Sequence, residues 1–186
     1  MIKLIDKVVD ILKKGGVILY PTDTVWGLGC DATNAQAVDR LFKIKKRMQD
    51  KSVIVLIENE KALNFFVDDI DKRLISFLTD SHEPQTVIFP QVKNLPLGVM
   101  NQNGSGAFRI PKNEFCLALL NRFKHPLVST SANYSGEATP LFFENISVDI
   151  KKEVDFVVPV CFEKGATHQP SKIVLIQKDG STLFLR

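Results

Sequence analysis

The sequence has little cysteine, and none of it stands at metal-binding spacing. Its 3 cysteines, Cys30, Cys116 and Cys161, are odd in number and far apart among 186 residues, which argues against a disulfide framework. No C-x-x-C pair occurs, which argues against a structural zinc site. The 3 histidines are equally scattered, so we expect surface or structural roles for them rather than metal ligation.

Long hydrophobic runs and charged tails are also missing. No apolar run approaches membrane-spanning length, and the N-terminus lacks the apolar stretch of a secretory signal. We therefore expect a cytoplasmic protein without membrane contact. The formal net charge is only +3, so any RNA contact must come from local clustering of basic residues. With 2 tyrosines and 1 tryptophan, the chain has few rings of the kinds that stack on RNA bases.

What the chain has in quantity is apolar residues in regular patterns. With 45% hydrophobic content, 186 residues suffice for one sizeable core, and we expect a single domain over residues 1–186. Apolar residues at helical spacing alternate with short strand-like runs, which predicts an α/β fold with a mixed sheet. The expected helices are Ile5–Leu12, Ala35–Lys45, Asp71–Thr79 and Glu114–Phe123. The expected strands are Val17–Tyr20, Val53–Ile57, Thr86–Phe89, Ala107–Ile110, Leu127–Thr130, Phe156–Val160, Ile173–Ile176 and Thr182–Leu185, the last two forming a hairpin through Asp179-Gly180.

The most informative segment is L-Y-P-T-D-T-V-W-G-L-G at Leu19–Gly29. Its strand ends at Pro21, which cannot donate a hydrogen bond to a central ladder. Two hydroxyls and one carboxylate follow in the T-D-T of residues 22–24, and ligands in α/β proteins often collect at strand ends. We expect Gly27 and Gly29 to permit tight turns or the close approach of a ligand. A plain strand–turn connection explains this segment equally well on its own.

Two further segments share this polar character. The run I-K-K-R at Ile44–Arg47 ends a helical pattern and is followed by Lys51; such cations often only complement the helix dipole. The run S-T-S-A-N-Y-S-G at Ser129–Gly136 follows an apolar strand, and hydroxyls and backbone N–H groups at such a turn suit phosphate oxygens. Each segment is a common loop when taken singly, but the three together predict a cleft for a polar, anionic ligand.

These motifs together resemble the YrdC-type threonylcarbamoyl-AMP synthases. P-T-D-T-V-W-G-L-G, the K-x-R of Lys45 and Arg47, and S-x-S-A-N-x-S-G at Ser129–Gly136 match that family in order and spacing over essentially the whole chain. The resemblance implies a twisted open sheet with flanking helices around a large concave cavity. It implies ATP-dependent conversion of L-threonine and bicarbonate into threonylcarbamoyl-AMP and pyrophosphate, for N6-threonylcarbamoyladenosine in tRNA. The family's longer branch has an appended domain, so a chain ending at Arg186 is expected to be the short, single-domain form.

The implied reaction brings two anions together, the threonine carbamate and the α-phosphate of ATP. The protein must gather positive charge and hold both substrates in line. We expect Lys45 and Arg47 to do this by electrostatics and positioning, although a solvated surface charge is the ordinary alternative for either. Arg109 lies in a strand, where alternation turns it away from its apolar neighbours. It can grip a carboxylate through two parallel bonds, or it can be an internal ion-pair partner, for example of Asp23.

Family positions can be matched residue by residue to this sequence. The resemblance implies that L-threonine is bound by Thr24, Arg109, Ser129 and Ser171. It implies that ATP is bound by Arg47, Lys51, Ser105, Ser131, Asn133, Thr139 and Arg186. Simpler roles stay open for the loop residues, since Ser131 can cap a turn and Asn133 can accept a left-handed backbone.

The sequence departs from the family pattern at several places. Met48 stands where the family often has the proline of K-x-R-P, and His82-Glu83-Pro84-Gln85-Thr86 stands in place of P-G-P-x-T. Residues 105–109 read S-G-A-F-R in place of T-V-x-V-R, Lys172 follows Ser171 where a threonine is common, and Trp26 replaces a tyrosine. Trp26 keeps a flat apolar face with a hydrogen-bond donor. The Glu83 carboxylate would weaken ATP binding if it pointed into the cavity.

Two other classes of function compete with the synthase. One is a paralogue of the same fold that binds RNA or nucleotides, and the other is a nucleotide-binding regulator without turnover. The enclosed hydroxyl set favours the synthase, because an RNA binder needs only surface cations, and neither an RNP-type aromatic strand nor a KH-type G-x-x-G loop is present.

The resemblance also bears on cofactors and partners. Mg²⁺ is expected to arrive with ATP, held by phosphate oxygens and water. We expect no permanent metal, because the motifs contain no D-x-D pair or acidic cluster; Asp23 either orients its turn or reaches a metal-bound water. The implied partners are tRNA or double-stranded RNA and the downstream tRNA-modifying complex.

Overall fold

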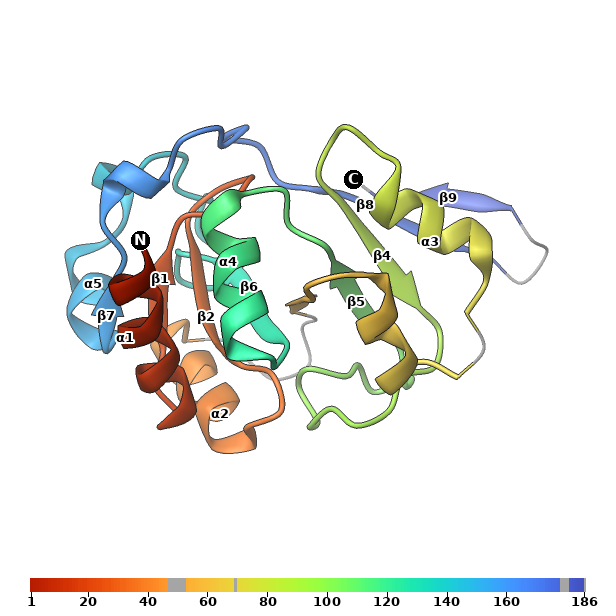
Figure 1. The fold of residues 1–186 in the computed structure, drawn as a ribbon, viewed down its shortest axis with the longest axis horizontal. Coiled ribbons are helices and arrows are strands. Elements are labelled where there is room, and N and C mark those ends of the chain that lie inside the picture. Colours follow the sequence, from red (N-terminus) through yellow and green to blue (C-terminus); the bar gives the residue numbers. More distant parts are fainter. Residues whose placement is uncertain (47–52, 69, 178–180, 186) are drawn as a thin grey trace.

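The computed structural model describes residues 1–46, 53–68, 70–177 and 181–185. Figure 1 shows helices and strands alternating along the chain, as the sequence predicts. The α-helices are α1 (Ile2–Lys13), α2 (Ala35–Ile44), α3 (Lys72–Thr79), α4 (Glu114–Phe123) and α5 (Val148–Glu153), and the 3₁₀ helices are η1 (Glu60–Phe65), η2 (Phe143–Asn145) and η3 (Val160–Phe162). The strands are β1 (Ile18–Tyr20), β2 (Gly27–Asp31), β3 (Ile54–Leu56), β4 (Gln85–Phe89), β5 (Gly106–Arg109), β6 (Leu127–Ser131), β7 (Phe156–Val157), β8 (Lys172–Ile176) and β9 (Thr182–Phe184).

The described strands form one mixed sheet in the order β7-β1-β2-β6-β3-β5-β4-β8-β9. β3 pairs with β5, β4 with β8 and β1 with β7 in parallel, whereas β6 is antiparallel to both its neighbours, β2 and β3. The β2–β6 register sets Gly27 opposite Ser131 and Gly29 opposite Ser129. Two motifs that lie about a hundred residues apart in the sequence are therefore adjacent in the sheet.

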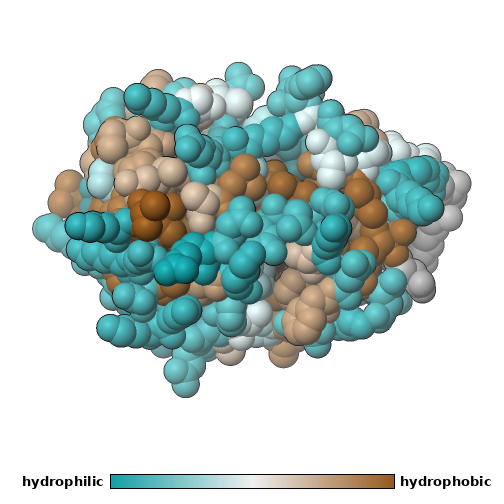
Figure 2. Space-filling model, viewed as in Figure 1, coloured by the Kyte–Doolittle hydropathy of each residue, from teal (hydrophilic) through white to brown (hydrophobic). Residues whose placement is uncertain are grey.

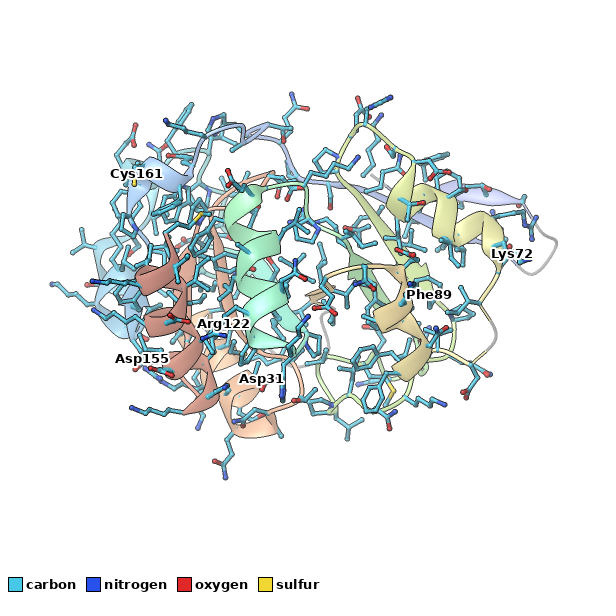
Figure 3. The ribbon with its side chains drawn as sticks, viewed as in Figure 1. Asp31, Lys72, Phe89, Arg122, Asp155 and Cys161 are labelled. Carbon is cyan, nitrogen blue, oxygen red and sulfur yellow. The ribbon has the colours of Figure 1, made fainter. Side chains whose placement is uncertain are left out.

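The sheet buries a hydrophobic cluster on each face. In β1, Ile18 and Tyr20 pack with α1 and α4, whereas Leu19 belongs to the cluster that contains the apolar side of α2. This is the alternation expected of a strand that is buried on both faces. Figure 1 shows α1 and α4 side by side. Arg122 of α4, labelled in Figure 3, donates through Nε to Asp6 Oδ1 of α1 at 2.8 Å.

The helix boundaries follow from local side-chain chemistry. Asn34 caps α2, because its side chain accepts a hydrogen bond from Ala37 N at 3.1 Å. Asn113 caps α4 in the same way through Cys116 N at 3.0 Å. α2 ends at Ile44, with Lys45 at the C-cap, and Lys46 has a left-handed φ of 49°. The helix thus stops at the K-x-R motif, as the sequence analysis predicted.

Several sequence predictions need correction. Gly27 and Gly29 were expected to permit tight turns or the close approach of a ligand; both lie within β2 and form no turn, and Gly27 lines the pocket described below. A Cβ on Gly29 would lie 2.6 Å from Tyr20 Cε1 and 2.9 Å from Val128 O, so this glycine is required by close packing in the sheet rather than by a turn. The expected strand Phe156–Val160 ends at Val157, because Pro159 precedes the 3₁₀ helix η3. The sequence analysis did not predict α5, η1 or η2.

The outer surface is mixed in character. Figure 2 shows a face that is largely hydrophilic, with apolar side chains gathered in smaller patches between the polar ones. Among the helices that the structure describes, none has both the length and the apolar character needed to cross a bilayer. Cys161, labelled in Figure 3, is exposed, whereas Cys30 and Cys116 are buried.

Candidate functional site

A pocket of about 360 Å³ opens where the ends of several strands meet. Side chains from the β1–β2 connection, β5, β6, the segment after β6 and the start of β8 line it. Among the residues predicted to bind substrates, those in the lining are Thr24, Arg109, Ser129, Ser131, Thr139 and Ser171. A second cavity, of about 610 Å³ near the C-terminal end of α4, contains none of them.

Arg109 is buried in the floor of the pocket and is paired with Asp23. Its guanidinium Nη2 lies 3.3 Å from Asp23 Oδ1, and both side chains are almost fully buried. The other carboxylate oxygen, Oδ2, accepts a hydrogen bond from Lys112 N at 3.0 Å. Asp23 therefore orients the turn and balances the arginine charge, which a buried guanidinium requires. The internal ion pair exists, and it coexists with a position in the pocket lining.

Thr24 places a hydroxyl against the same guanidinium. Thr24 Oγ1 accepts from Arg109 Nη1 at 3.0 Å and lies 2.8 Å from Thr22 Oγ1. Thr22 already donates its hydroxyl proton to Val25 O at 2.8 Å, and a hydroxyl has only one proton to give. Thr24 must then be the donor in the Thr22–Thr24 contact. This chain of hydrogen bonds fixes the orientation of the Thr24 hydroxyl before any ligand arrives.

No thiol at this site is prepared for nucleophilic chemistry. Cys116 lies beneath the T-D-T turn, and its Sγ is 3.4 Å from Pro21 O. Burial, aided by the negative charge of Asp23, raises the pKa of this thiol above its ordinary value. Burial likewise raises the pKa of Cys30. Both groups stay protonated near neutral pH, so the pocket offers binding groups rather than an activated cysteine.

Ser171 reaches the pocket from the start of β8. Its Oγ lies 2.8 Å from Thr86 Oγ1 of β4, and both residues are buried. The neighbouring Lys172 forms an ion pair with Glu83, and both side chains are more than half exposed. The lysine lowers the pKa of the Glu83 carboxyl. These two departures from the family pattern therefore pair with each other, and neither residue lines the pocket.

Lys45 connects α2 to the loop that follows β6. Its ammonium group donates to Ser131 O, and to Asn133 O at 2.7 Å. Its own carbonyl accepts from Ser135 N at 2.9 Å. Lys45 is 1% exposed and does not belong to the pocket lining. In this structure its charge is therefore directed at the loop backbone.

Within that loop, side chains also hold the turn. Ser131 Oγ donates to Asn133 Oδ1 at 2.5 Å, and Asn133 Nδ2 donates to Glu137 O at 2.7 Å. Lys46 Nζ lies 4.2 Å from the centre of the Tyr134 ring, a cation–π contact. Ser131, Asn133 and Thr139 are all half-buried. This end of the pocket is thus more open than the end at Arg109.

Not every predicted residue reaches the pocket. Ser105 is buried, donates to Asn103 Oδ1 at 2.7 Å and accepts from Asn101 Nδ2 at 2.8 Å, and it is absent from the lining, as is Asn133. Arg47, Lys51 and Arg186 lie outside the described residues. The binding roles of Ser105, Asn133, Arg47, Lys51 and Arg186 therefore stay predictions.

The structure also adds residues that the sequence analysis did not assign to the site. Thr22 lines the pocket and could have been found from the same T-D-T motif. Thr86 supports Ser171; it stands at the threonine of the altered P-G-P-x-T motif, but the sequence analysis gave it no role in the site. Pro170 and Leu185 line the pocket because β8 and β9 bring the C-terminal part of the chain beside β4.

The described side chains do not offer a site for a resident metal ion. No group of three or more His, Cys, Asp or Glu residues stands close enough to hold one in the parts of the chain that are described. One Asp23 oxygen faces the guanidinium of Arg109 and the other accepts from Lys112 N. This carboxylate is therefore engaged by the protein itself.

Comparison with other proteins gives a consistent assignment. The family model Sua5_yciO_yrdC, described as telomere recombination, matches residues 10–186. The threonylcarbamoyl-AMP synthase of Pseudoalteromonas translucida is 37% identical over 171 residues, covering 89% of each chain. That of Xanthomonas axonopodis pv. citri is 38% identical over 173 residues, covering 91% of each.

Two solved structures share the fold. E. coli YciO aligns with a TM-score of 0.80 at 25% identity, over 99% of this chain and 88% of that one. P. abyssi Sua5 in complex with L-threonine aligns with a TM-score of 0.86 at 22% identity, over 98% of this chain. This chain spans about half the length of that Sua5 chain, 53%. The match of the family model and the identity to the synthases lead to one conclusion: the chain belongs to the Sua5/YciO/YrdC family.

Proposed function

We propose that the protein is an L-threonylcarbamoyladenylate synthase, a nucleotidyltransferase that makes threonylcarbamoyl-AMP and pyrophosphate from L-threonine, bicarbonate and ATP. The observation that carries this proposal is the pocket with two unlike ends. One end holds a buried guanidinium with oriented hydroxyls, and the other is a half-open loop of hydroxyls. The names of the relatives at 37% and 38% identity support the same activity.

Threonine occupies the buried end in this proposal. Arg109 holds its carboxylate, because a planar guanidinium can make two parallel bonds to a carboxylate. Thr24, Ser129 and Ser171 supply hydroxyls around the amino acid, and all three are at most 6% exposed. An amino acid in this end is shielded from water, which strengthens each charged hydrogen bond.

ATP occupies the open end. Ser131, Asn133 and Thr139 border it, and Arg47, Lys51, Ser105 and Arg186 complete the proposed nucleotide set. Hydroxyls, backbone N–H groups and cations are the usual partners of phosphate oxygens. Mg²⁺ enters as part of the ATP substrate, bound by phosphate oxygens and water rather than by protein carboxylates.

The chemistry needs alignment more than a protein nucleophile. The threonine amine combines with bicarbonate, releasing water and forming a carbamate. A carbamate oxygen then attacks the α-phosphorus, and the bond from that phosphorus to the bridging oxygen breaks as pyrophosphate leaves. Both reactants are anions, so the gain comes from holding them in line among positive charges. Lys45 serves this by fixing the loop that carries Ser131, and Arg47 is proposed to supply positive charge for the phosphates.

The product fits a role in tRNA modification. We propose that the adenylate passes to a downstream tRNA-modifying complex, for N6-threonylcarbamoyladenosine, and that tRNA or double-stranded RNA is a further partner. We propose a cytoplasmic location, where ATP and tRNA are both available.

The experiment that tests this proposal follows pyrophosphate release by the pure protein. ATP, Mg²⁺, bicarbonate and threonine are supplied together, and each is then omitted in turn. The proposal predicts release that requires both threonine and bicarbonate. Release without threonine, or no release, would contradict it and favour a paralogue that binds RNA or nucleotides.

A further inference from the structure

We propose that His168 is a positioning residue that fixes the position of the buried end of the pocket relative to the open end. His168 lies in the segment between η3 and β8, two residues before Pro170 and three before Ser171, which both line the pocket. It is not itself part of the lining. The proposal rests on the proposed synthase function, since it concerns the alignment of that enzyme's two substrates.

His168 is joined to the threonine end through its backbone. His168 N donates to Thr24 O at 2.9 Å, and the preceding Thr167 N donates to Asp23 O at 3.0 Å. Thr24 and Asp23 are the two residues that contact the Arg109 guanidinium. A displacement of residues 167–168 would therefore displace the backbone that carries the oriented hydroxyl and the carboxylate.

His168 is joined to the nucleotide end through its side chain. The ring atom Nδ1 lies 2.9 Å from Leu141 O, and the ring packs on Phe142 at 4.6 Å between centroids. Thr139, which lines the pocket, stands two residues before Leu141. A carbonyl oxygen only accepts, so Nδ1 carries the proton in this contact. The carboxylate of Glu163 also faces this nitrogen, with Oε1 at 3.9 Å from Nδ1.

The backbone of His168 adopts an uncommon conformation. Its φ is 53°, in the left-handed region, which non-glycine residues adopt in a few per cent of cases, with asparagine, aspartate and histidine the most frequent among them. Such a conformation persists where surrounding contacts determine it. Here they come from the T-D-T turn on one side and the segment after β6 on the other. His168 is one link between these segments, beside the ring contact of Trp26 with Phe143, and in-line attack depends on their relative placement.

The test compares substitutions that separate the Nδ1 donor from the rest of the ring. His168→Asn places an amide nitrogen at the position of Nδ1 and tolerates a left-handed backbone. His168→Gln moves the amide one bond further out, to the position of Nε2. His168→Gly keeps the backbone conformation and removes the side chain. His125→Asn is the matched control: His125 also packs on a phenylalanine, Phe123 at 5.1 Å, and directs Nδ1 at Asp31, but it lies away from the pocket.

Pyrophosphate turnover is the first readout. We expect His168→Gly and His168→Gln to lower kcat by about tenfold, while the separate dissociation constants of threonine and ATP change less than about threefold. His168→Asn should stay within about threefold of the wild-type kcat, and His125→Asn should be unchanged. Equal kcat values for the Asn and Gln variants would overturn the proposal, as would losses of affinity that account for the whole effect.

A second readout does not require activity. Trp26 is the single tryptophan, it follows the T-D-T turn closely, and its ring lies 4.8 Å from that of Phe143, next to Phe142. Its fluorescence therefore reports how the two segments pack. Quenching by acrylamide should increase in the Gly and Gln variants and stay low in the Asn variant. If the wild type makes no threonylcarbamoyl-AMP, the proposed function fails on its own, and an unchanged quenching pattern would separately refute the link.

Discussion

The two ends of the pocket are built in different ways. At the buried end, Arg109 and Thr24 are 2% and 3% exposed, and an ion pair and a chain of hydroxyls hold them in place. At the open end, Ser131 and Asn133 are half-buried, and Lys45 donates to the backbone carbonyls of both residues. The buried end, which we call the cradle, is formed by the buried side chains of Arg109, Thr24 and Asp23. The open end is a half-exposed loop that the buried Lys45 holds from below.

This difference matches the chemistry that each end is proposed to perform. A small zwitterion such as threonine gives few contacts, so its site gains most from low dielectric and preorganised groups. A nucleotide is large and brings its own charge and metal ion, so an open border suffices. The contrast predicts that substitutions at the buried end lower both the stability of the fold and the affinity for threonine. Substitution of Lys45, which holds the loop at the open end, should lower the affinity for ATP.

The largest expected effect follows from removing the guanidinium. Arg109→Ala leaves the buried carboxylate of Asp23 without its partner, which should lower the free energy of unfolding by about 3–5 kcal/mol. Denaturant unfolding measures this. The double variant Arg109→Ala with Asp23→Asn should recover much of the stability but none of the threonine affinity. Full recovery of threonine binding in the double variant would show that Arg109 is only structural.

A milder change at the same residue separates charge from geometry. Arg109→Lys keeps the positive charge near Asp23 but loses the planar fork that makes two parallel bonds. The concentration of threonine needed for half-maximal turnover should rise markedly, while ATP affinity changes little. Calorimetry with each ligand measures the two affinities. Parallel losses for both ligands would contradict the threonine assignment.

At the open end, the strongest effect should come from the loop support. Lys45→Met removes the ammonium group that donates to the half-buried carbonyls of Ser131 and Asn133. A hydrogen bond to a charged group contributes about 1.5–3 kcal/mol to the stability of the folded state, so the loop should lose part of its support. ATP affinity should fall, whereas threonine affinity should stay close to wild type. Lys43→Met is the matched control, because Lys43 is exposed in the last turn of the same helix. Unchanged ATP binding in Lys45→Met would show that the loop keeps its shape unaided.

A smaller effect is expected from one hydroxyl of the cradle. Thr24→Val preserves shape but removes the acceptor for Arg109 Nη1. Threonine affinity should fall by about 1 kcal/mol, the usual contribution of one hydrogen bond, with ATP affinity unchanged. Calorimetry with threonine measures this loss. Thr33→Val is the control, because Thr33 donates to Asp31 away from the pocket. If the Thr24→Val variant bound threonine with full affinity, the Thr24 hydroxyl would have no role in threonine binding.

The smallest effect should come from the ion pair outside the cradle. Glu83 and Lys172 are more than half exposed, and exposed pairs contribute little. Glu83→Gln should leave kcat and both affinities within about twofold of wild type. A large gain in ATP affinity would indicate that the Glu83 carboxylate does reach the phosphates when they are bound.

Much of the fold could be predicted because local patterns decide it. The buried stripe of α1 and the caps of α2 and α4 depend on residues that are close together in the sequence. β2 was missed because two of its five residues are glycines. Their role depends on the Tyr20 ring and the β6 backbone, which are contacts that only the assembled sheet creates. α5 is too short, at 6 residues, to show a convincing helical period.

The site shows the same limit. Motifs placed Thr24, Arg109 and Ser131 because each is marked by its neighbours along the chain. Their neighbours in space were harder to find. Thr86 contacts Ser171 from β4, and His168 donates its backbone N–H to Thr24 O from the segment before β8; neither contact is visible in the order of residues along the chain. The sequence analysis left open whether Arg109 binds a ligand or pairs with Asp23. The structure shows the pair with Asp23 in a residue that also lines the pocket.

The most direct test of the account is to identify the product. The protein is incubated with ATP, Mg²⁺, threonine and ¹³C-labelled bicarbonate, and the nucleotide products are analysed by mass spectrometry. The account predicts an adenylate that contains threonine and a single ¹³C atom, formed in equal amount to pyrophosphate. AMP or ADP without any labelled adenylate would contradict it.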